Sequence, residues 1–523
     1  MSDFANEPLL EFRRGYLRDS ALAALAALDA TLPITVPLVL DGDAVERAQI
    51  DSVDPADPRR VVSRGAASNT RDAAAAVASA ADRHGAWAAT PGAGRAATRS
   101  RAAGGLRGRR LELAALAVRE AGKPWVEADA DVCEAIDFLE YYAREAVALA
   151  DGPSLLQLPG ERNTMRFAPR GVVVVIAPWN FPFAIPTGMS AAALATGNAV
   201  VLKPAEQTPA CAAAIAAALR EAGLPEGVLT LLPGGDEPAK ALVADPRVHT
   251  VAFTGSCAAG LAIAERAAKV APGQDHLKNV VIEMGGKNCV IVDSDADLDD
   301  VVPAVLASAF AFAGQKCSAA SRVLVHRDIS GTLVSRLAGA LDTLRVGPAR
   351  DFSIDVPPVI DAAAQERIIG VVRAEIDRGA TALRRAVPDD RGFYVAPTIF
   401  LEPAPQAGVV QEEIFGPVLT VETVNDADAA CDVVDRCRFA LTGGLFSRSP
   451  RTIERVIVRS PVGNLYVNRA TTGAMVGRQP FGGNKLSGTG TKAGGPGYLM
   501  HFVEPRAVTE NTVRHGLVIQ QHF

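Results

Sequence analysis

Short apolar runs separated by alanine-rich stretches limit the folds open to this chain more than any other feature. The runs lie at residues 172–176, 199–202, 228–232, 250–253 and 280–283. The stretch at 209–222 between two of them has the composition of a helix. Strands that alternate with helices predict a parallel sheet covered on both faces, and ligands commonly bind beyond the carboxyl ends of such strands. The Gly-x-Gly-x-x-Gly motif of many dinucleotide-binding domains is absent, so the pattern predicts an α/β fold without identifying the ligand.

One stretch of this region is long enough to be mistaken for a membrane span. Residues 171–202 contain no charged side chain, and about 20 apolar residues suffice to cross a bilayer. However, Pro178, Pro182 and Pro186 would interrupt a membrane helix repeatedly. The opening run 172–176 also reads as a buried strand. We therefore expect strand, loop, helix and strand here.

A second α/β segment is expected from Val290 to about Gln479, with strands near residues 322–325, 418–421 and 463–468. The expected domains are residues 1–149 with 169–289, then 290–485, and a bridging segment of 150–168 with 486–523. The first of these begins with a polar helical segment before Leu38. A site between the two α/β domains is expected, because interdomain clefts are common ligand sites.

Two residues on either side of this boundary have the chemistry of a covalent oxidation. Cys317 lies in a loop of small residues, and Glu283 ends the last strand of the first segment. A thiolate is the best side-chain nucleophile near neutral pH, and a carboxylate can activate water as a general base. An arbitrary cysteine is nevertheless more often a buried structural residue. The surrounding motifs decide between these readings.

Composition excludes several classes of function. With 523 residues, 49% of them hydrophobic, the chain can bury large cores, and a net charge of −6 gives no reason to expect nucleic acid or an anionic membrane surface as partner. The seven cysteines show no pair at metal-ligand or redox spacing, so no metal is expected. The first residues show no secretory signal, and we expect a cytoplasmic protein that acts on a small molecule.

Seven motifs together resemble the aldehyde dehydrogenase superfamily from about Leu38 to Phe502. In order they are Ala-Pro-Trp-Asn-Phe-Pro at 177–182, Leu-Lys-Pro-Ala-Glu at 202–206, Phe-Thr-Gly-Ser at 253–256, Ile-Glu-Met-Gly-Gly-Lys at 282–287, Phe-Ala-Gly-Gln-Lys-Cys at 312–317, Glu-Glu-Ile-Phe-Gly-Pro at 412–417 and Pro-Phe-Gly-Gly at 480–483. The resemblance implies a Rossmann-type NAD-binding domain, an α/β catalytic domain and a small oligomerisation flap, in a homo-oligomer whose tail packs on a neighbouring subunit. It also implies oxidation of an aldehyde to an acid with NAD.

The resemblance assigns the catalytic roles. Cys317 is expected to be the nucleophile, and the side-chain amide of Asn180 with the Cys317 N–H is expected to stabilise the oxyanion. Glu283 is expected to activate the water that hydrolyses the thioester. The alternatives are a loop asparagine that satisfies local backbone groups at 180 and a solvated strand-end carboxylate at 283.

The same resemblance assigns a cofactor set. Lys203 and Glu206 would bond the adenine ribose hydroxyls, and the carboxylate at 206 favours NAD over NADP. An exposed ion pair at a helix entrance is the alternative for these two residues. The remaining members of the set are Trp179 and Ser256 at the pyrophosphate, Glu413 at the nicotinamide ribose, Phe415 against the nicotinamide ring, and Ala177, Gly255 and Gly285.

The glycine-rich segment 486–499 resembles that of the glutamate-semialdehyde (1-pyrroline-5-carboxylate) dehydrogenases. Consecutive glycine N–H groups can bind an anion, so Gly494, Gly495 and the Ser318 hydroxyl are expected to hold the α-carboxylate of the substrate. The other substrate residues are Phe181 and Phe502 beside its aliphatic chain, and Glu134. An ordinary flexible glycine loop is the alternative for 494 and 495.

The expected reaction is therefore oxidation of L-glutamate γ-semialdehyde to L-glutamate, the second step of proline degradation. Because the sequence is too short for a fused proline dehydrogenase barrel, a stand-alone enzyme is expected. One alternative is a dehydrogenase for another small acidic or amino aldehyde, such as succinic semialdehyde. Another is a non-catalytic binding protein that retains the fold.

Overall fold

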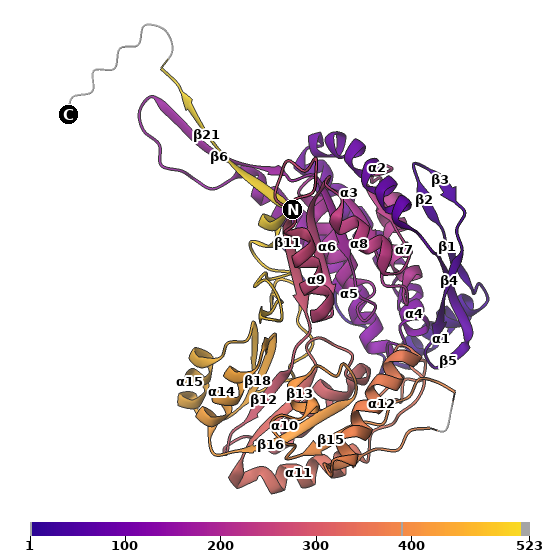
Figure 1. Ribbon diagram of the computed structural model, residues 1–523, viewed down its shortest axis with the longest axis vertical. Helices are drawn as coiled ribbons and strands as arrows, with labels where there is room; N and C mark the ends of the chain where they lie inside the picture. The colour runs from indigo at the N-terminus through magenta and orange to yellow at the C-terminus, as the bar shows by residue number, and fades with distance from the viewer. Residues whose placement is uncertain (1–2, 389–390, 514–523) are drawn as a thin grey trace, which may run out of the picture.

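The computed structural model describes residues 3–388 and 391–513, and its first domain is built on a five-stranded parallel sheet (Figure 1). Its strand order is β11-β10-β7-β8-β9. The strands are β7 (Val172–Ile176), β8 (Ala199–Lys203), β9 (Leu229–Leu231), β10 (Val248–Gly255) and β11 (Asn279–Met284). These are the strands expected from the apolar runs. The strand order reverses at β7, which pairs with both β8 and β10, and ligands bind beside such a reversal in open α/β sheets.

Both faces of this sheet are covered, as the uncharged strands require. Val173 and Val175 of β7 point into a core shared with α3 (Gly92–Gly108), α4 (Arg110–Glu120), α5 (Trp125–Asp151), α6 (Ala184–Ala195) and α7 (Pro209–Glu221). Val172 and Val174 point the opposite way, towards α2 (Thr70–Ala89), α8 (Asp236–Ala244) and α9 (Cys257–Ala267). The alternation follows from the two-residue period of a strand. No helix in the described ranges is long and apolar enough to cross a membrane.

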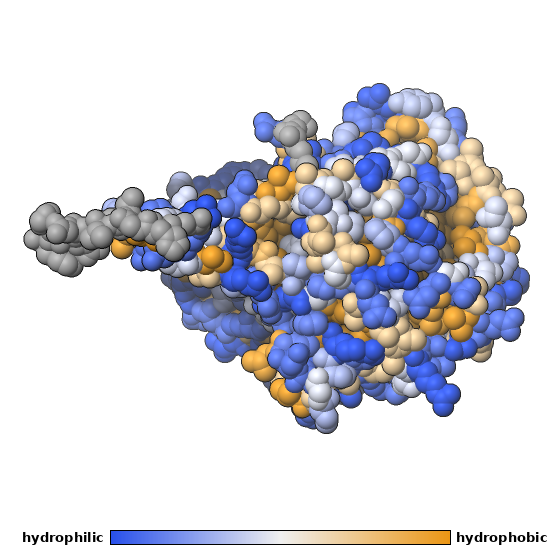
Figure 2. Space-filling model, turned by 90° about the horizontal axis from the view of Figure 1, so that it is seen from above, coloured by the Kyte–Doolittle hydropathy of each residue, from blue (hydrophilic) through white to orange (hydrophobic). Residues whose placement is uncertain are grey.

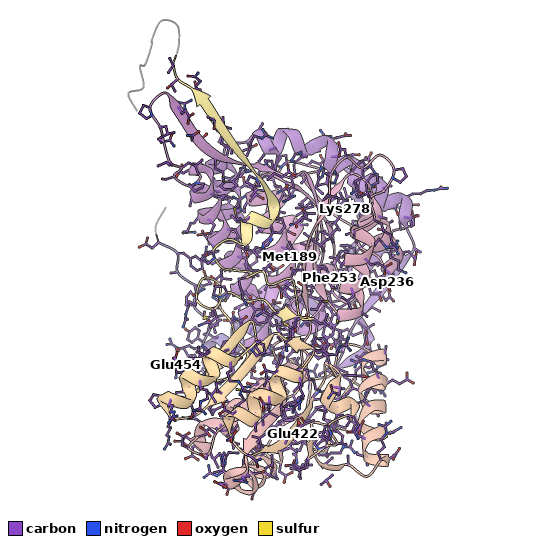
Figure 3. The ribbon with its side chains drawn as sticks, turned by 60° about the vertical axis from the view of Figure 1, so that its left-hand side comes forward. Met189, Asp236, Phe253, Lys278, Glu422 and Glu454 are labelled. Atoms are coloured by element: carbon purple, nitrogen blue, oxygen red, sulfur yellow. The ribbon has the colours of Figure 1, made fainter. Side chains whose placement is uncertain are left out.

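The second domain is a seven-stranded sheet in the order β14-β15-β16-β13-β12-β18-β19, antiparallel only between β14 and β15. The strands are β12 (Asn288–Val292), β13 (Ala320–His326), β14 (Thr381–Arg384), β15 (Thr398–Leu401), β16 (Val418–Val424), β18 (Thr442–Phe446) and β19 (Asn464–Val467). Its covering helices are α10 (Leu298–Phe310), α11 (Arg327–Leu341), α12 (Ala362–Asp377), α14 (Ala427–Arg436) and α15 (Pro450–Arg459). Figure 3 places Met189 and Phe253 in the first domain, and Glu422 in the second. Glu422 of β16 pairs with Arg322 of the neighbouring β13 at 2.6 Å.

A two-stranded arm projects from the first domain (Figure 1). It pairs β6 (Glu161–Pro169) with β21 (Val503–Asn511) in antiparallel register. Seen from above, the surface of the body mixes hydrophilic and hydrophobic side chains (Figure 2). The chain before the arm is not a loose tail, because the N–H of Thr489 donates to the carbonyl of Ile282 on β11 at 2.9 Å. The expected bridging segment continues to residue 523, and its last ten residues lie outside the described ranges.

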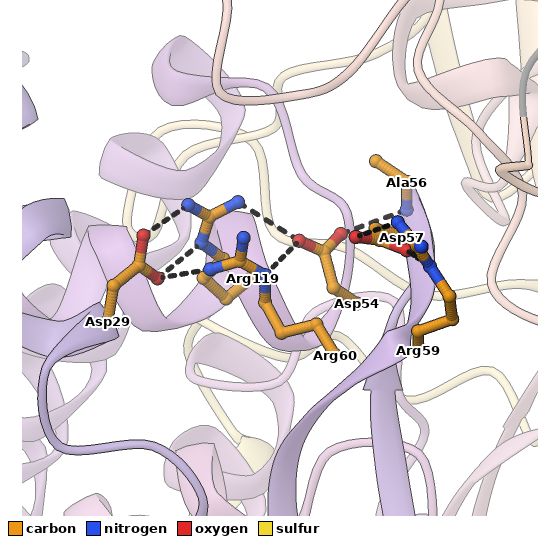
Figure 4. A network of polar contacts seen from close by, with 7 residues as sticks. All are labelled: Asp29, Asp54, Ala56, Asp57, Arg59, Arg60 and Arg119. Carbon is orange, nitrogen blue, oxygen red and sulfur yellow. Dashed lines mark hydrogen bonds and ion pairs between the residues drawn. The ribbon is translucent and has the colours of Figure 1, made fainter.

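The N-terminal region is tied to the first domain by a buried charge network (Figure 4). Arg119 on α4 donates to Asp29, at the end of α1 (Gly15–Asp29), at 2.8 and 2.6 Å. It also donates to Asp54 on β4 (Gln49–Asp54) at 3.0 Å, and Arg60 on β5 (Asp57–Ala66) approaches Asp29 at 3.0 Å. Removal of one partner would leave a buried charge unpaired, which is strongly destabilising.

Candidate active site

Cys317 lies in a turn of the second domain that faces the carboxyl ends of the first-domain strands. The turn follows a short helix, η1 (Ala311–Gly314), and precedes β13. Phe312 and Ala313 have φ of 52° and 55°, in the left-handed region that non-glycine residues rarely adopt. At Gly314 a Cβ would lie 2.3 Å from the carbonyl oxygen of Gly416, so only glycine fits there. The surrounding structure therefore imposes the conformation that presents Cys317, as is common at functional sites.

A cavity of about 260 Å³ opens beside the Cys317 thiol. Among the residues that the sequence assigned to the site, Phe181, Ser318 and Glu134 share this cavity with Cys317. Burial raises the pKa of Glu134 to about 8, and the neighbouring Asp131 carboxylate adds to the increase. A cationic group in the cavity would favour the ionised carboxylate.

The Asn180 side chain lies beside the cysteine turn. Its Nδ2 donates to the carbonyl of Gln315 at 2.9 Å, which leaves its second hydrogen free for another acceptor. The backbone N–H of Cys317 donates to no group in the described part of the chain. Burial, and then the carboxylates of Glu413, Glu283 and Glu134, raise the pKa of the Cys317 thiol to about 12. The thiol is therefore protonated until another group stabilises its anion.

Lys123 fixes the two residues next to the thiol and was not found from the sequence. Its side chain is fully buried, and Nζ donates to the carbonyl of Asn180 at 2.7 Å. The same Nζ lies 3.8 Å from the centre of the Phe181 ring, a cation–π distance. Lys123 precedes α5 and follows Gly122 in a sequence with no pattern that points to this contact.

Glu283 occupies the end of β11, held away from bulk water by the loop at 482–491. Its carboxylate accepts hydrogen bonds from the N–H of Gly483 and the hydroxyl of Thr491, both at 2.9 Å. A Cβ at Gly488 would lie 2.8 Å from Oε2. Burial raises the pKa of Glu283 to about 8 despite these hydrogen bonds. A carboxylate with such a pKa is suited to take a proton from water near neutral pH.

The proposed cofactor residues gather at the carboxyl ends of the first-domain strands. Ala177 follows β7, and its N–H donates to the carbonyl of Lys203 at the end of β8 at 3.1 Å. The Lys203 ammonium is buried, which lowers its pKa, and it donates no hydrogen bond to a described residue. The Glu206 carboxylate is exposed and accepts none within the same ranges. Gly255 ends β10, and Ser256 is the N-cap of α9.

The other half of this set surrounds Glu413. Its Oε1 accepts from the N–H of Gly286 at 3.0 Å, and a Cβ at Gly285 would lie 2.0 Å from both carboxylate oxygens. The Glu413 carboxylate can therefore occupy this position only because residue 285 is a glycine, which has no Cβ. The ring of Phe415 meets that of Trp179 edge-on at 5.7 Å, so the two expected neighbours of a bound ligand lie together.

Three predicted substrate residues, Gly494, Gly495 and Phe502, do not line this cavity. The N–H of Gly494 donates to the Tyr142 hydroxyl at 2.8 Å, and the N–H of Gly495 donates to the carbonyl of Lys492 at 3.2 Å. Phe502 is 0% exposed in the core of the first domain. The two glycine N–H groups already have partners, so they form no free anion site.

A different loop brings unpaired N–H groups to the cavity. Thr472, Gly473, Ala474 and Phe481 line the cavity with Cys317. The backbone N–H groups of Gly473 and Ala474 have no partner among residues 3–388 and 391–513. Gly473 has φ of 79°, which glycine adopts at no steric cost. The signal was one glycine beside small residues, weaker than the paired glycines at 494 and 495.

The described ranges contain no cluster of three histidine, cysteine or carboxylate side chains that could hold a metal ion. In the wall of the cavity, the Lys316 ammonium forms an ion pair with the Glu127 carboxylate at 2.5 Å. The site thus consists of a thiol, amide donors, buried carboxylates and a pocket at the reversal of a parallel sheet.

Comparisons with known proteins agree with this arrangement. A profile described as the aldehyde dehydrogenase family matches residues 42–508. The 1-pyrroline-5-carboxylate dehydrogenase of Geobacillus thermodenitrificans is 43% identical over 509 residues, covering 97% of this chain and 99% of that protein. A structure of 1-pyrroline-5-carboxylate dehydrogenase from Thermus with bound NAD is 40% identical, with a TM-score of 0.94 over 98% of this chain and 99% of that one.

A longer protein is also similar. Proline utilization A (PutA) from Bdellovibrio bacteriovorus, in a crystal structure inactivated by N-propargylglycine, is 44% identical with a TM-score of 0.97. The match covers 99% of this chain but 54% of that chain, so this chain spans about half of its length. The predicted α/β fold is confirmed, and the chain belongs to the aldehyde dehydrogenase family.

Proposed function

We propose that the protein oxidises L-glutamate γ-semialdehyde, which forms from 1-pyrroline-5-carboxylate, to L-glutamate with NAD, in the degradation of proline. The observation that carries this proposal is the cavity that joins Cys317 to the hydroxyl of Ser318 and to the N–H groups of Gly473 and Ala474. The similar proteins named 1-pyrroline-5-carboxylate dehydrogenase support it.

The two ends of the cavity suit the two charges of the substrate. Free N–H groups at Gly473 and Ala474 and the Ser318 hydroxyl, which has no partner among the described residues, can donate to an α-carboxylate. Glu134 offers a buried carboxylate to the α-ammonium group, which would lower the pKa of Glu134 on binding. Phe181 and Phe481 line the space between them, where the aliphatic chain would lie.

The chemistry of this chain's residues then follows. The Cys317 thiol gives up its proton to water, its sulfur attacks the aldehyde carbon, and the free hydrogen of Asn180 Nδ2 with the Cys317 N–H stabilises the oxyanion. When the oxyanion collapses, a hydride leaves the carbon and a thioester remains on the sulfur. Glu283 takes a proton from water, the resulting hydroxide attacks the thioester carbon, and the acid departs as Cys317 regains its thiolate. Movement of Glu283 out of its bonds to Gly483 and Thr491 would bring it to that water.

NAD fits the free groups at the strand ends. The buried Lys203 ammonium, with no hydrogen-bond partner in the described ranges, and the Glu206 carboxylate would hold the adenine ribose. Ser256 at the N-terminus of α9 would meet the pyrophosphate, and Glu413 and Phe415 would hold the nicotinamide end. Bound NAD supplies the hydride acceptor. A negative charge at Glu206 disfavours a 2′-phosphate and therefore NADP.

Further parts of the proposal concern assembly and location. Apolar side chains next to the arm of β6 and β21 are exposed, among them Leu156 at 85% exposure. Packing of this arm on a second copy would form a homo-oligomer. Residues 1–149 with 169–289 would act as the NAD-binding domain, 290–485 as the catalytic domain, and 150–168 with 486–523 as the bridging segment. A cytoplasmic location fits a reaction that needs free thiols.

NADH absorbance with a panel of aldehydes tests the function. The panel contains L-glutamate γ-semialdehyde supplied with its cyclic imine at controlled pH, succinic semialdehyde and pentanal. The highest kcat/KM should belong to L-glutamate γ-semialdehyde, because only this aldehyde carries both charged groups. A higher kcat/KM for succinic semialdehyde would favour the alternative acidic aldehyde. Absence of NADH with every aldehyde would favour a binding protein without turnover.

A further inference from the structure

An extended segment at the N-terminus, residues 4–10, forms one side of the substrate cavity. This segment, here termed the N-terminal strap, has no regular secondary structure and runs beside α5, the helix that carries Glu134. Glu7 and Leu9 of the strap line the cavity together with Cys317 and Ser318. A segment far from the thiol in sequence therefore contributes directly to the wall of the site.

Asn6 in the strap joins two other walls of the same cavity. Its Nδ2 donates to Asp137 Oδ2 on α5 at 2.8 Å and to the carbonyl of Val476 at 2.9 Å. The other oxygen of Asp137 accepts from the N–H of Glu7 at 2.7 Å. Both hydrogens of one amide group are thus used, one on the helix that carries Glu134 and one on the loop that follows Gly473.

The loop is attached at its ends: Val476 is buried, and the N–H of Gly477 donates to the carbonyl of Gly494 at 2.7 Å. The N–H of Thr471 donates to Ser308 Oγ at 3.1 Å, and that of Met475 donates to Gln479 Oε1 at 3.1 Å. Between these points, residues 472–474 donate no backbone hydrogen bond to the described chain. The bond from Asn6 to Val476 therefore fixes the loop from the side of the strap, close to the free N–H groups.

The strap itself is held independently of the Asn6 side chain. The N–H of Leu10 donates to Asp129 Oδ2 at 2.9 Å, and the ring of Phe4 packs edge-on against Tyr141 at 5.2 Å. Removal of the Asn6 amide should accordingly leave the strap in place and loosen the loop on the side that faces the strap.

We propose that Asn6 is a positioning residue for substrate selection. It holds the loop 472–476 so that the N–H groups of Gly473 and Ala474 point at the substrate carboxylate. This inference rests on the proposed function for the identity of the ligand, and on the geometry alone for the link between strap and loop.

Kinetics of three variants of the full chain test the effect on selection. Asn6→Ala removes both donors, and Asn6→Asp removes them while keeping the side-chain size and placing a second carboxylate beside Asp137. Both variants should raise KM for L-glutamate γ-semialdehyde about tenfold. They should leave kcat, and kcat/KM for pentanal, within about twofold of the wild-type values, because a misplaced anchor weakens the binding only of the ligand that uses it. Glu11→Ala is the matched control, because Glu11 lies on the same stretch of chain and, within the described residues, pairs only with the exposed Arg13 and Arg14.

Hydrogen–deuterium exchange of peptides that cover residues 475–479, where the N–H groups of Met475, Gly477 and Gln479 are hydrogen-bonded, tests the positioning without a substrate. Exchange should be faster in Asn6→Ala and unchanged in Glu11→Ala. Unchanged exchange in Asn6→Ala, or an equal loss of activity with both aldehydes, would overturn the inference. If the wild-type protein shows no preference for the semialdehyde over pentanal, the proposed substrate is wrong, and the exchange measurement alone decides whether Asn6 positions the loop.

Discussion

A single methyl group at position 285 should weaken the binding of NAD. In the structure a Cβ at Gly285 would lie 2.0 Å from each carboxylate oxygen of Glu413, whereas real Cβ atoms essentially never approach closer than 3.0 Å. The carboxylate must therefore retreat by about 1 Å. A misplacement of that size at a reacting group can lower the reaction rate by up to about 100-fold. It would also give up its hydrogen bond from the N–H of Gly286.

The magnitude follows from the hydrogen bonds that Glu413 is proposed to make. Hydrogen bonds to a charged group contribute about 1.5–3 kcal/mol each, and about 1.4 kcal/mol corresponds to a factor of ten. Loss of one such bond to the nicotinamide ribose should raise KM for NAD by about 10- to 100-fold in Gly285→Ala. The measurement is initial-rate kinetics with NAD varied at saturating aldehyde.

Two variants make this result interpretable. Gly331→Ala on α11 is the matched control, because a Cβ there meets no atom within 4 Å, and its KM for NAD should equal that of the wild type. Glu413→Gln removes the charge without a clash and should also raise KM for NAD. A wild-type KM in Gly285→Ala would refute the assignment of Glu413 to the cofactor.

Three other changes have expected outcomes. Glu206→Ser should lower the ratio of kcat/KM for NAD to that for NADP, and an unchanged ratio would place Glu206 away from the adenine ribose. Ser318→Ala should raise KM for L-glutamate γ-semialdehyde while kcat/KM for pentanal stays within about twofold, because pentanal has no carboxylate to bind; an equal effect on both would remove Ser318 from the anchor. Since Glu283 must be ionised to act as a base and burial raises its pKa to about 8, thioester hydrolysis should accelerate as pH rises through about 8. Thr491→Val deletes a hydrogen bond that lowers this pKa, so the pH profile of single-turnover hydrolysis should move to higher pH, and an unmoved profile would contradict the assignment of the base.

The parts of the molecule that could be predicted from sequence are those encoded locally. Buried parallel strands such as Val172–Ile176 are uninterrupted apolar runs, and their helices occur between them, so the first domain follows from order and composition. The motif around Cys317 needs special backbone geometry at Gly314, and such a motif is recognisable without the fold. Cys317, Glu283 and Asn180 could be assigned as candidate catalytic residues for this reason.

Gly473 and Ala474, the proposed anion anchor, could not be predicted because the paired glycines at 494 and 495 form the stronger local pattern. Gly494 has φ of 68°, and its N–H donates to the Tyr142 hydroxyl, so a glycine at this position serves the packing of the chain. Gly473 lies open to the cavity, a difference that only the tertiary structure reveals. The bond from Asn6 to Val476 joins residues far apart in the chain, and no local pattern identifies such a contact.

The central claim is that Cys317 carries the substrate as a thioester that Glu283 hydrolyses. Intact-protein and peptide mass spectrometry of Glu283→Gln, quenched after mixing with NAD and L-glutamate γ-semialdehyde, tests it most directly. We expect a single-turnover burst of NADH and a glutamyl adduct on the peptide that contains Cys317, with neither in Cys317→Ala. Wild-type steady-state turnover in Glu283→Gln, or an adduct on another residue, would contradict it.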